Sequence, residues 1–334
     1  MSFIPDDTLF CILIKLPVKS LLRFQSVSKP WNTIISDHKF KKAHGDQSNT
    51  LGRLKFLLQK QVGTYIKDFY GVKEIESVEL RNPRVVIEKI LLPVTSSRIL
   101  CSYDGLVLLH TYKACDTFGL WNPSTRQYKT LVCPYLDSSS KLPNACGLCY
   151  DSTTDDYKII LIFRSFYVVY SANKNLWKMR KTLPILEQSL ENHSSDLFSD
   201  VTTEGISSTT EGCVYWSLDE GRKKFLQQVR KTSIIIRFDV KSDELEELSA
   251  LDCVGEEELF CMSPLKGCLS LYGGETSGHE SDVWIMEQDE WKCLVKVRGF
   301  VQSLKETKLL CCTEDGELIF LGLMQHHISI YNPR

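Results

Sequence analysis

The chain has 334 residues, enough for one large domain beside a small one. Its 40 basic and 42 acidic residues leave a net charge of −2, which argues against the basic face that nucleic-acid binding requires. The longest apolar runs, such as residues 159–163, are far too short to span a membrane, and the N-terminus lacks a signal-peptide pattern. We therefore expect neither nucleic acid nor membrane among its partners.

The thirteen cysteines are scattered along the chain and odd in number. A chain of this length can fold without disulfide staples, so in the absence of a secretion signal we expect reduced thiols that pack as small apolar side chains. This predicts a cytoplasmic or nuclear protein, in which the sequon at Asn192 has no role.

Three short amphipathic helices are predicted in residues 1–44. The first begins near Pro5, which suits a first helical turn, and ends before Pro17. The second begins at residues 18–20, and the third has Ser28 as its N-cap and Pro30 in its first turn. Each has an apolar face at helical spacing: Leu9, Ile12, Leu13 and Leu16; Leu21, Leu22 and Phe24; Trp31, Ile34 and Ile35.

A unit of about 40 residues is marginal on its own. Its apolar faces either pack on the rest of the chain as a cap or are shared with a partner. The order of residues favours the partner: Ile-Pro-Asp-Asp at 4–7, Leu-Pro-Val-Lys-Ser-Leu at 16–21 and Val-Ser-Lys-Pro-Trp at 27–31. This segment resembles the F-box, although Pro30 stands where family members often have Ser or Arg.

The resemblance implies that the head binds a Skp-type adaptor and, through it, the cullin and RING subunits of a ubiquitin ligase. It also implies which side chains are buried, partly against that adaptor. These are Pro5, Leu9, Ile12, Leu13, Leu16, Pro17, Leu21, Leu22, Val27 and Trp31.

The residue pattern of the sequence changes after His44. Residues 45–52 are polar and are interpreted as a linker, and residues 53–334 are interpreted as an all-β domain of short Val-, Ile- and aromatic-rich strands. Large apolar residues seven positions apart flank turn formers and predict four β-hairpins: Trp121 with Tyr128, Tyr170 with Trp177, Phe238 with Leu245, and Trp284 with Trp291. A glycine-led apolar strand precedes each hairpin, at Gly105, Gly147, Gly212 and Gly267, and a fifth unit starts at Gly316.

The leading aromatic residues recur at intervals of 49, 68, 46 and 47 residues, ending at Tyr331. A period in the forties with several strands per unit is typical of β-propeller blades and less so of a β-sandwich. The long interval contains an insertion. With residues 52–95 as a further unit, we expect about six blades. The last is incomplete, either because the chain is truncated or because a strand from residues 52–95 completes the ring.

The β domain resembles the kelch-like F-box-associated domain of many plant F-box proteins, from about residue 95 onward. The residues that carry the resemblance are Leu-Trp-Asn-Pro-Ser-Thr at 120–125, Cys-Gly-Leu-Cys-Tyr-Asp at 146–151 followed by Asp-Tyr-Lys at 156–158, and Gly-Cys-Val-Tyr-Trp at 212–216. Family members usually have Gly-Phe-Gly-Tyr-Asp at the second of these.

Catalytic and metal-binding motifs are missing from the sequence. Cys146 and Cys149 have C-x-x-C spacing but lack a second pair at suitable range, and the adjacent pairs Cys311-Cys312 and His326-His327 cannot easily share a metal. We find no nucleophile elbow, phosphate loop, His-Glu-x-x-His or dinucleotide fingerprint. We therefore expect no cofactor and no catalysis.

Two stretches could contact a partner. Residues 187–211 are a polar insertion, and residues 222–231 are basic and close in sequence to the acidic positions 243–247. For the basic stretch, ordinary solvated charge is the simpler interpretation. The leading hypothesis is a substrate-recognition subunit of an SCF-type ubiquitin ligase that binds an unidentified target protein. The alternatives are a binding scaffold outside ubiquitination and a propeller enzyme.

Overall fold

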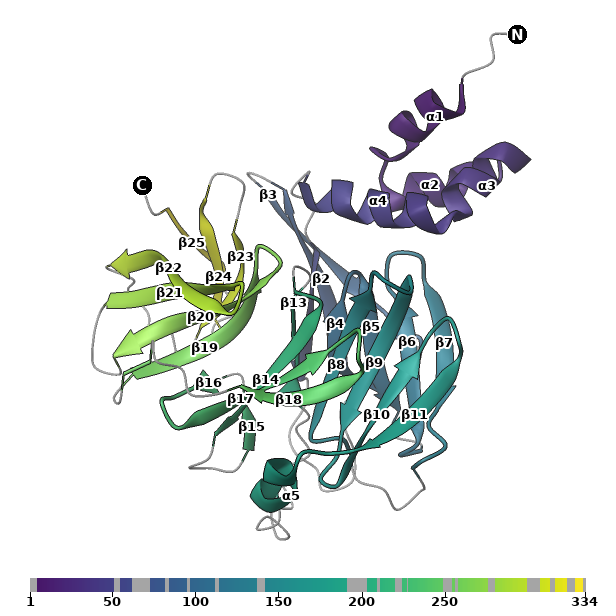
Figure 1. Cartoon of the computed structure of the whole chain (residues 1–334). Helices are drawn as coiled ribbons and strands as arrows, with labels where there is room; N and C mark the ends of the chain where they lie inside the picture. Colours follow the sequence, from purple (N-terminus) through teal and green to yellow (C-terminus); the bar gives the residue numbers. More distant parts are fainter. Residues whose placement is uncertain are drawn as a thin grey trace. The chain divides into compact units, whose positions relative to one another are not determined.

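The computed structural model describes residues 5–50, 55–61, 73–81, 84–94, 97–111, 114–136, 142–190, 203–208, 211–219, 224–226, 228–248, 254–255, 258–275, 280–298, 307–312, 316–322 and 328–332. The chain divides into two compact units, Met1–Val132 and Cys133–Arg334, which are described separately. The first contains a helical head and two sheets, and the second contains the remaining sheets and one short helix (Figure 1).

The head has four helices where the sequence predicted three: α1 (Asp6–Leu13), α2 (Val18–Phe24), α3 (Lys29–Ser36) and α4 (His38–Thr50). The backbone N–H of Trp31 donates to Ser28 Oγ at 3.3 Å, which confirms the predicted N-cap of α3. The fourth helix follows at once because Asp37 Oδ1 accepts the N–H groups of Lys39 and Phe40, at 2.9 and 3.2 Å. Helix α4 continues to Thr50, so residues 45–50 are helical, whereas the domain bounds at 44 and 52 stay a prediction.

The head has a small core of its own. Two edge-to-face ring pairs bind its helices together, Phe10 with Phe40 and Phe24 with Trp31. The buried side chain of His44 reaches back from α4, where Nε2 donates to the carbonyl oxygen of Leu16 at 2.7 Å. The fully buried apolar side chains are Leu9, Leu13, Leu21, Ile35 and Phe40.

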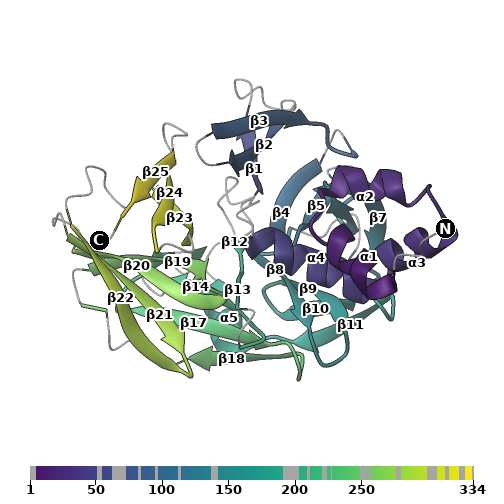
Figure 2. The same ribbon diagram turned by 90° about the horizontal axis from the view of Figure 1, so that it is seen from above.

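Two antiparallel sheets complete the first unit. Strands β1 (Lys55–Gln61), β2 (Lys73–Arg81) and β3 (Arg84–Ile90) form one, and β4 (Ser97–Tyr103), β5 (Leu106–Thr111), β6 (Thr117–Asn122) and β7 (Gln127–Val132) form a four-stranded meander. Figure 2 shows the two sheets with the head from above.

The second unit repeats the meander. Strands β8 (Ala145–Asp151), β9 (Asp156–Ile162), β10 (Phe166–Ser171) and β11 (Leu176–Lys181) form one sheet, with β12 (Thr203–Glu204) added in parallel beside β8. The next contains β14 (Cys213–Asp219), β17 (Ser233–Asp239) and β18 (Glu244–Leu248), with β13 (Ile206–Ser208) and β15 (Lys224–Leu226) on β14. The third contains β19 (Glu258–Leu265), β20 (Cys268–Glu275), β21 (Glu280–Glu287) and β22 (Glu290–Arg298), with β16 (Gln228–Val229) on β19. The last contains β23 (Thr307–Cys312), β24 (Leu318–Gly322) and β25 (Ile328–Tyr331).

The expected count of about six blades is wrong, because only the five sheets from β4 onward carry the repeat. The β1–β3 sheet has neither a glycine-led apolar strand nor the aromatic hairpin, and in the part of the chain that the structure describes its strands pair with one another alone. It therefore adds no strand to the β23–β25 sheet among the described residues. The insertion, residues 187–211, contains the end of helix α5 (Pro184–Leu190) and strands β12 and β13.

Three of the four predicted hairpins have the predicted register, with Trp121 opposite Tyr128, Tyr170 opposite Trp177 and Phe238 opposite Leu245. Each has a four-residue loop whose last residue is left-handed, namely Arg126, Asn175 and Asp243.

The fourth prediction is wrong, because Trp284 pairs with Cys293 and Met286 pairs with Trp291. Both Gln288 and Asp289 have positive φ and close this hairpin with only two residues, so the pairing shifts.

The indole of Trp216 explains one of the predicted strand glycines. Trp216 is fully buried, and its Nε1 donates to the carbonyl oxygen of Cys146 at 3.0 Å. A Cβ at Gly147 would lie 2.9 Å from Trp216 Cζ2, and one at Gly205 would lie 2.6 Å from Val214 Cγ1. These two positions need glycine for close approach between the β8 and β14 sheets. Gly105, Gly212 and Gly267 differ from them, because their φ is positive.

Candidate functional site

The ten side chains predicted to contact an adaptor separate into two groups by burial. Leu9, Leu13 and Leu21 are buried in the core of the head itself, and Leu16 and Trp31 are half-buried against that core. These five side chains hold the helices of the head together. They would therefore act on a partner indirectly, by positioning the exposed residues.

The other five predicted side chains are exposed, and we name this set the adaptor surface after the prediction: Pro5, Ile12, Pro17, Leu22 and Val27. The exposed fractions of its aliphatic members are 48% for Ile12, 40% for Leu22 and 59% for Val27. Isolated exposed apolar residues are ordinary on protein surfaces. Here, however, they come from successive short elements of one small unit, from the start of α1 to the α2–α3 turn.

Hydrogen bonds fix the turn that presents Val27. Its N–H donates to the carbonyl oxygen of Phe24 at 3.0 Å, and Ser26 Oγ donates to that of Arg23 at 2.7 Å. The Ser28 cap then starts α3 directly behind it. Val27 is therefore held outward by a defined turn, which lowers the entropy lost when a partner covers it.

In the second unit, a buried lysine joins two sheets. Lys158 on β9 places Nζ 3.0 Å from Asp151 Oδ2 and 2.7 Å from Asp243 Oδ1, and it donates to the carbonyl oxygen of Val240 at 2.6 Å. Tyr167 Oη donates to the backbone oxygen of Asp243 at 3.0 Å. Asp243 belongs to the β17–β18 loop, so these bonds tie that loop to the β8–β11 sheet.

Two charges of this network, Asp151 and Lys158, are held in their ionised forms. Burial alone would raise the pKa of Asp151, but hydrogen bonds from Thr153, Thr154 and Lys158 outweigh it and hold that pKa well below its ordinary value. Burial alone would lower the pKa of Lys158, but Asp243 and Asp151 outweigh it and raise that pKa. The lysine is thus a fully paired structural cation.

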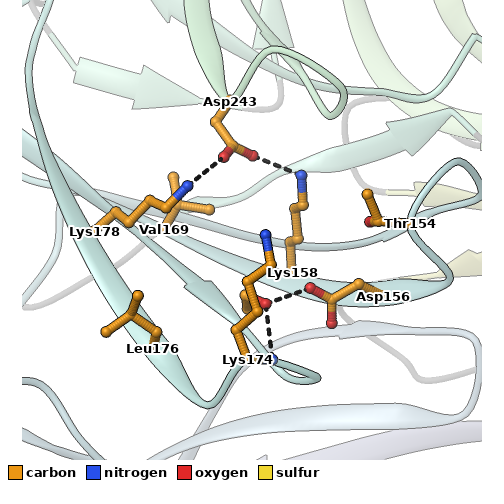
Figure 3. A pocket seen from close by; sticks show the side chains of 9 residues that line it. Thr154, Asp156, Lys158, Val169, Lys174, Leu176, Lys178 and Asp243 are labelled. Atoms are coloured by element: carbon orange, nitrogen blue, oxygen red, sulfur yellow. Dashed lines mark hydrogen bonds and ion pairs between the residues drawn. The ribbon is translucent and has the colours of Figure 1, made fainter.

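A small pocket lies beside this network (Figure 3). Its volume is about 40 Å³, and Figure 3 shows Asp243 bridging Lys158 and Lys178, with the nitrogen of Lys174 pointing into the same space. The carboxylate of Asp156 already accepts hydrogen bonds from Ser171 Oγ and from the N–H of Asn173.

The acidic positions 243–247 do not form one exposed patch. Asp243 is buried with Lys158, Glu244 lies 3.7 Å from Arg180, and Glu246 lies 2.7 Å from Arg237. In the basic stretch, Arg230 and Lys231 are described, whereas Arg222 and Lys223 lie outside the described residues. So does much of the insertion, residues 191–202.

Cys146 and Cys149 are both buried on β8. Burial raises the pKa of the Cys149 thiol, which donates to the carbonyl oxygen of Lys158 at 3.8 Å. Within the described ranges no group of three or more His, Cys, Asp or Glu side chains could hold a metal ion, and no helix is long and apolar enough to cross a membrane. His326 and His327 lie outside the described residues.

Comparison with known proteins identifies both parts of the chain. Residues 1–43 match the family model of the F-box domain, and residues 76–334 match that of the F-box associated beta propeller domain. These matches define the class as a helical F-box followed by a β-propeller domain, of which the described residues contain five repeated sheets. The chain belongs to the family of F-box proteins with an F-box associated β-propeller domain.

Three relatives from Arabidopsis thaliana illustrate the likeness. The F-box/kelch-repeat protein At3g23880 is 25% identical, over 98% of this chain and 87% of its own length. The F-box protein CPR1 is 26% identical, over 97% and 80%, and the putative F-box protein At1g47790 is 30% identical, over 96% and 79%. Both resemblances seen in the sequence are thereby confirmed.

Sequence reasoning missed the Asp151–Lys158–Asp243 network. In the sequence, the Asp-Tyr-Lys run at 156–158 stands out only as a family feature, and Asp243 only as one of the acidic positions 243–247. A lysine flanked by apolar strand residues was the available signal, because such a lysine needs a buried partner.

Proposed function

We propose that this chain is the substrate-recognition subunit of an SCF-type ubiquitin ligase. The F-box would bind a Skp-type adaptor, and through it cullin and RING subunits, and the β-propeller would bind the target protein. The chain itself would catalyse nothing, and it would work in the cytoplasm or nucleus. The observation that carries this proposal is the adaptor surface, exposed on a domain that matches the F-box family over residues 1–43.

The energetics suit a protein partner. Fully burying an aliphatic side chain contributes about 1.5–3 kcal/mol. Ile12, Leu22 and Val27 start roughly half exposed, so covering all three would contribute on the order of 2–4 kcal/mol before the costs of association. That is enough to account for a central part of a specific interface.

The role of such a subunit is tethering. A target held by the propeller is presented to a ubiquitin-loaded enzyme in the same assembly, so transfer becomes effectively unimolecular. This requires two separate binding surfaces on one chain and no catalytic group, in keeping with the satisfied, buried character of the polar network around Lys158.

Co-purification of the full chain with a Skp-type adaptor tests the proposal. The wild-type chain should retain the adaptor, and Leu22→Asp should lose it because a carboxylate would be desolvated in the interface. Leu294→Asp, at a residue of β22 with 38% exposure, is the matched control and should bind normally. Retention of the adaptor by Leu22→Asp, or failure of the wild-type chain to bind, would contradict the proposal and favour a scaffold outside ubiquitination.

A further inference from the structure

Two pockets of the second unit adjoin along one face of strands β10 and β11. The first is lined by the opposed pairs Ser171–Leu176 and Val169–Lys178, and the second by the next pair on that face, Tyr167–Arg180. The opposite wall is continuous too, since Asp243 lines the first pocket and its neighbour Glu244 lines the second. The two pockets thus follow one another along β11, and we treat them together as one groove.

The dimensions suit an extended peptide. From Leu176 to Arg180 the strand advances four residues, which corresponds to about 13 Å at about 3.3 Å per residue. The second pocket is the wider, with a volume of about 380 Å³. The groove spans the five positions from Leu176 to Arg180, so it accepts about five residues of extended chain in register with β11.

The solvent-facing charge of the groove is positive. Lys178 is 47% exposed and Arg180 is 37% exposed, and Lys174 and Lys181 are also exposed along the same strand and its preceding loop. Among the acidic residues that line the two pockets, Asp156 and Asp243 are buried and Glu244 is exposed. We call Lys174, Leu176, Lys178, Arg180 and Lys181 the basic trough.

The buried carboxylates do not cancel this excess. Asp156 accepts hydrogen bonds from Ser171 and Asn173. Asp243 pairs closely with Lys158, at 2.7 Å, and its distance to Lys178 Nζ is longer, at 3.8 Å. Arg180 lies 3.7 Å from Glu244, at the outer limit of an ion pair. Lys178 and Arg180 therefore keep hydrogen-bonding capacity for an incoming anion. The chain as a whole has a net charge of −2, so the trough stands out locally.

We propose that the basic trough binds an extended acidic segment of the target protein, with carboxylates at alternate positions. Alternate residues of an extended chain lie about 6.6 Å apart, the same spacing as Lys178 and Arg180 on β11. Leu176, which is 52% exposed at one end, supplies a contact for an apolar residue that precedes the acidic pair. This proposal names the chemistry of the target segment. It rests on the proposed function in one respect, namely that the bound segment belongs to a target protein.

Fluorescence anisotropy with the full chain tests the proposal. The probe is a short labelled peptide centred on Leu-Ser-Glu-Ser-Glu, compared with a matched peptide that has Lys in place of Glu. The acidic peptide should bind at least about tenfold more tightly, and the difference should shrink as salt rises. Equal affinity of the two peptides, or binding of neither, would overturn the proposal. A tenfold preference for phosphoserine over glutamate would overturn the carboxylate assignment.

Neutral substitutions locate the site. Lys178→Gln with Arg180→Gln should weaken binding of the acidic peptide about tenfold, whereas the matched pair Lys292→Gln with Lys296→Gln, two exposed lysines of β22, should not change it. A second variant, Lys174→Gln with Lys181→Gln, keeps both Lys178 and Arg180, which pair with Asp243 and Glu244, and should also weaken binding of the acidic peptide. Unchanged affinity in both trough variants would overturn the proposal. Retention of a Skp-type adaptor by the same variants shows that the proposed function itself is not what failed.

Discussion

The head and the β11 region of the second unit expose opposite kinds of side chain. The head leaves aliphatic groups such as Ile12 and Val27 in water, because four short helices cannot bury all of them. The second unit buries a lysine between two aspartates and leaves further cations exposed above it. One chain thus has an apolar surface and an electrostatic one. Binding to the first should be almost insensitive to salt, and binding to the second should weaken with salt.

The largest expected effect is a loss of stability on disrupting the buried Asp151–Lys158–Asp243 network, with adaptor binding by the head unchanged. Lys158→Met leaves Asp151 and Asp243 without their shared cation, so the free energy of unfolding should fall by about 3–5 kcal/mol in chemical denaturation. Lys292→Met, which removes an exposed pair with Glu287, should cause no measurable change. Equal stability of the two variants would show that the network contributes nothing.

Close packing between sheets gives the next effect. Gly205→Ala places a Cβ against Val214 and the buried indole of Trp216, and overpacking of this kind costs about 1–3 kcal/mol. Thermal unfolding should show the loss, while adaptor binding stays unchanged. Wild-type stability in this variant would mean that the β8 and β14 sheets are looser than the structure shows.

Acid should weaken the second unit through Asp151. Its pKa is lower when folded than its ordinary 3.8, so its stabilising effect is present above that pH and is lost as pH falls below it. Denaturation curves at a series of pH values should show stability falling between about pH 4 and pH 2, less steeply in Asp151→Asn. Identical pH profiles for variant and wild type would rule out this contribution.

Local signals made much of the fold predictable. The Trp121–Tyr128 register followed from a four-residue loop of turn formers, and the cap at Ser28 followed from its place before a helix. The predicted pairing of Trp284 with Trp291 was wrong because the loop of that hairpin has only two residues, which changes the register. The spacing of the aromatic residues does not reveal the length of the loop.

The sites were harder to predict. The sequence does not show which of the ten predicted head residues are buried in the head and which are exposed. The packing of the helices decides this, with Leu13 buried and its neighbour Ile12 exposed. Asp243 and Lys158 are 85 residues apart, so nothing local indicates their contact. The trough depends on the alternation of β11 and on a wall from the next sheet, and both are tertiary features.

The most direct test of the account compares two valines of nearly equal exposure, Val27 at 59% in the head and Val132 at 56% at the end of β7. The affinity of the full chain for a Skp-type adaptor should fall at least about tenfold in Val27→Asp and stay unchanged in Val132→Asp, because only the first would place a carboxylate in the interface. Equal affinities for the two variants would contradict the assignment of the adaptor surface to the head.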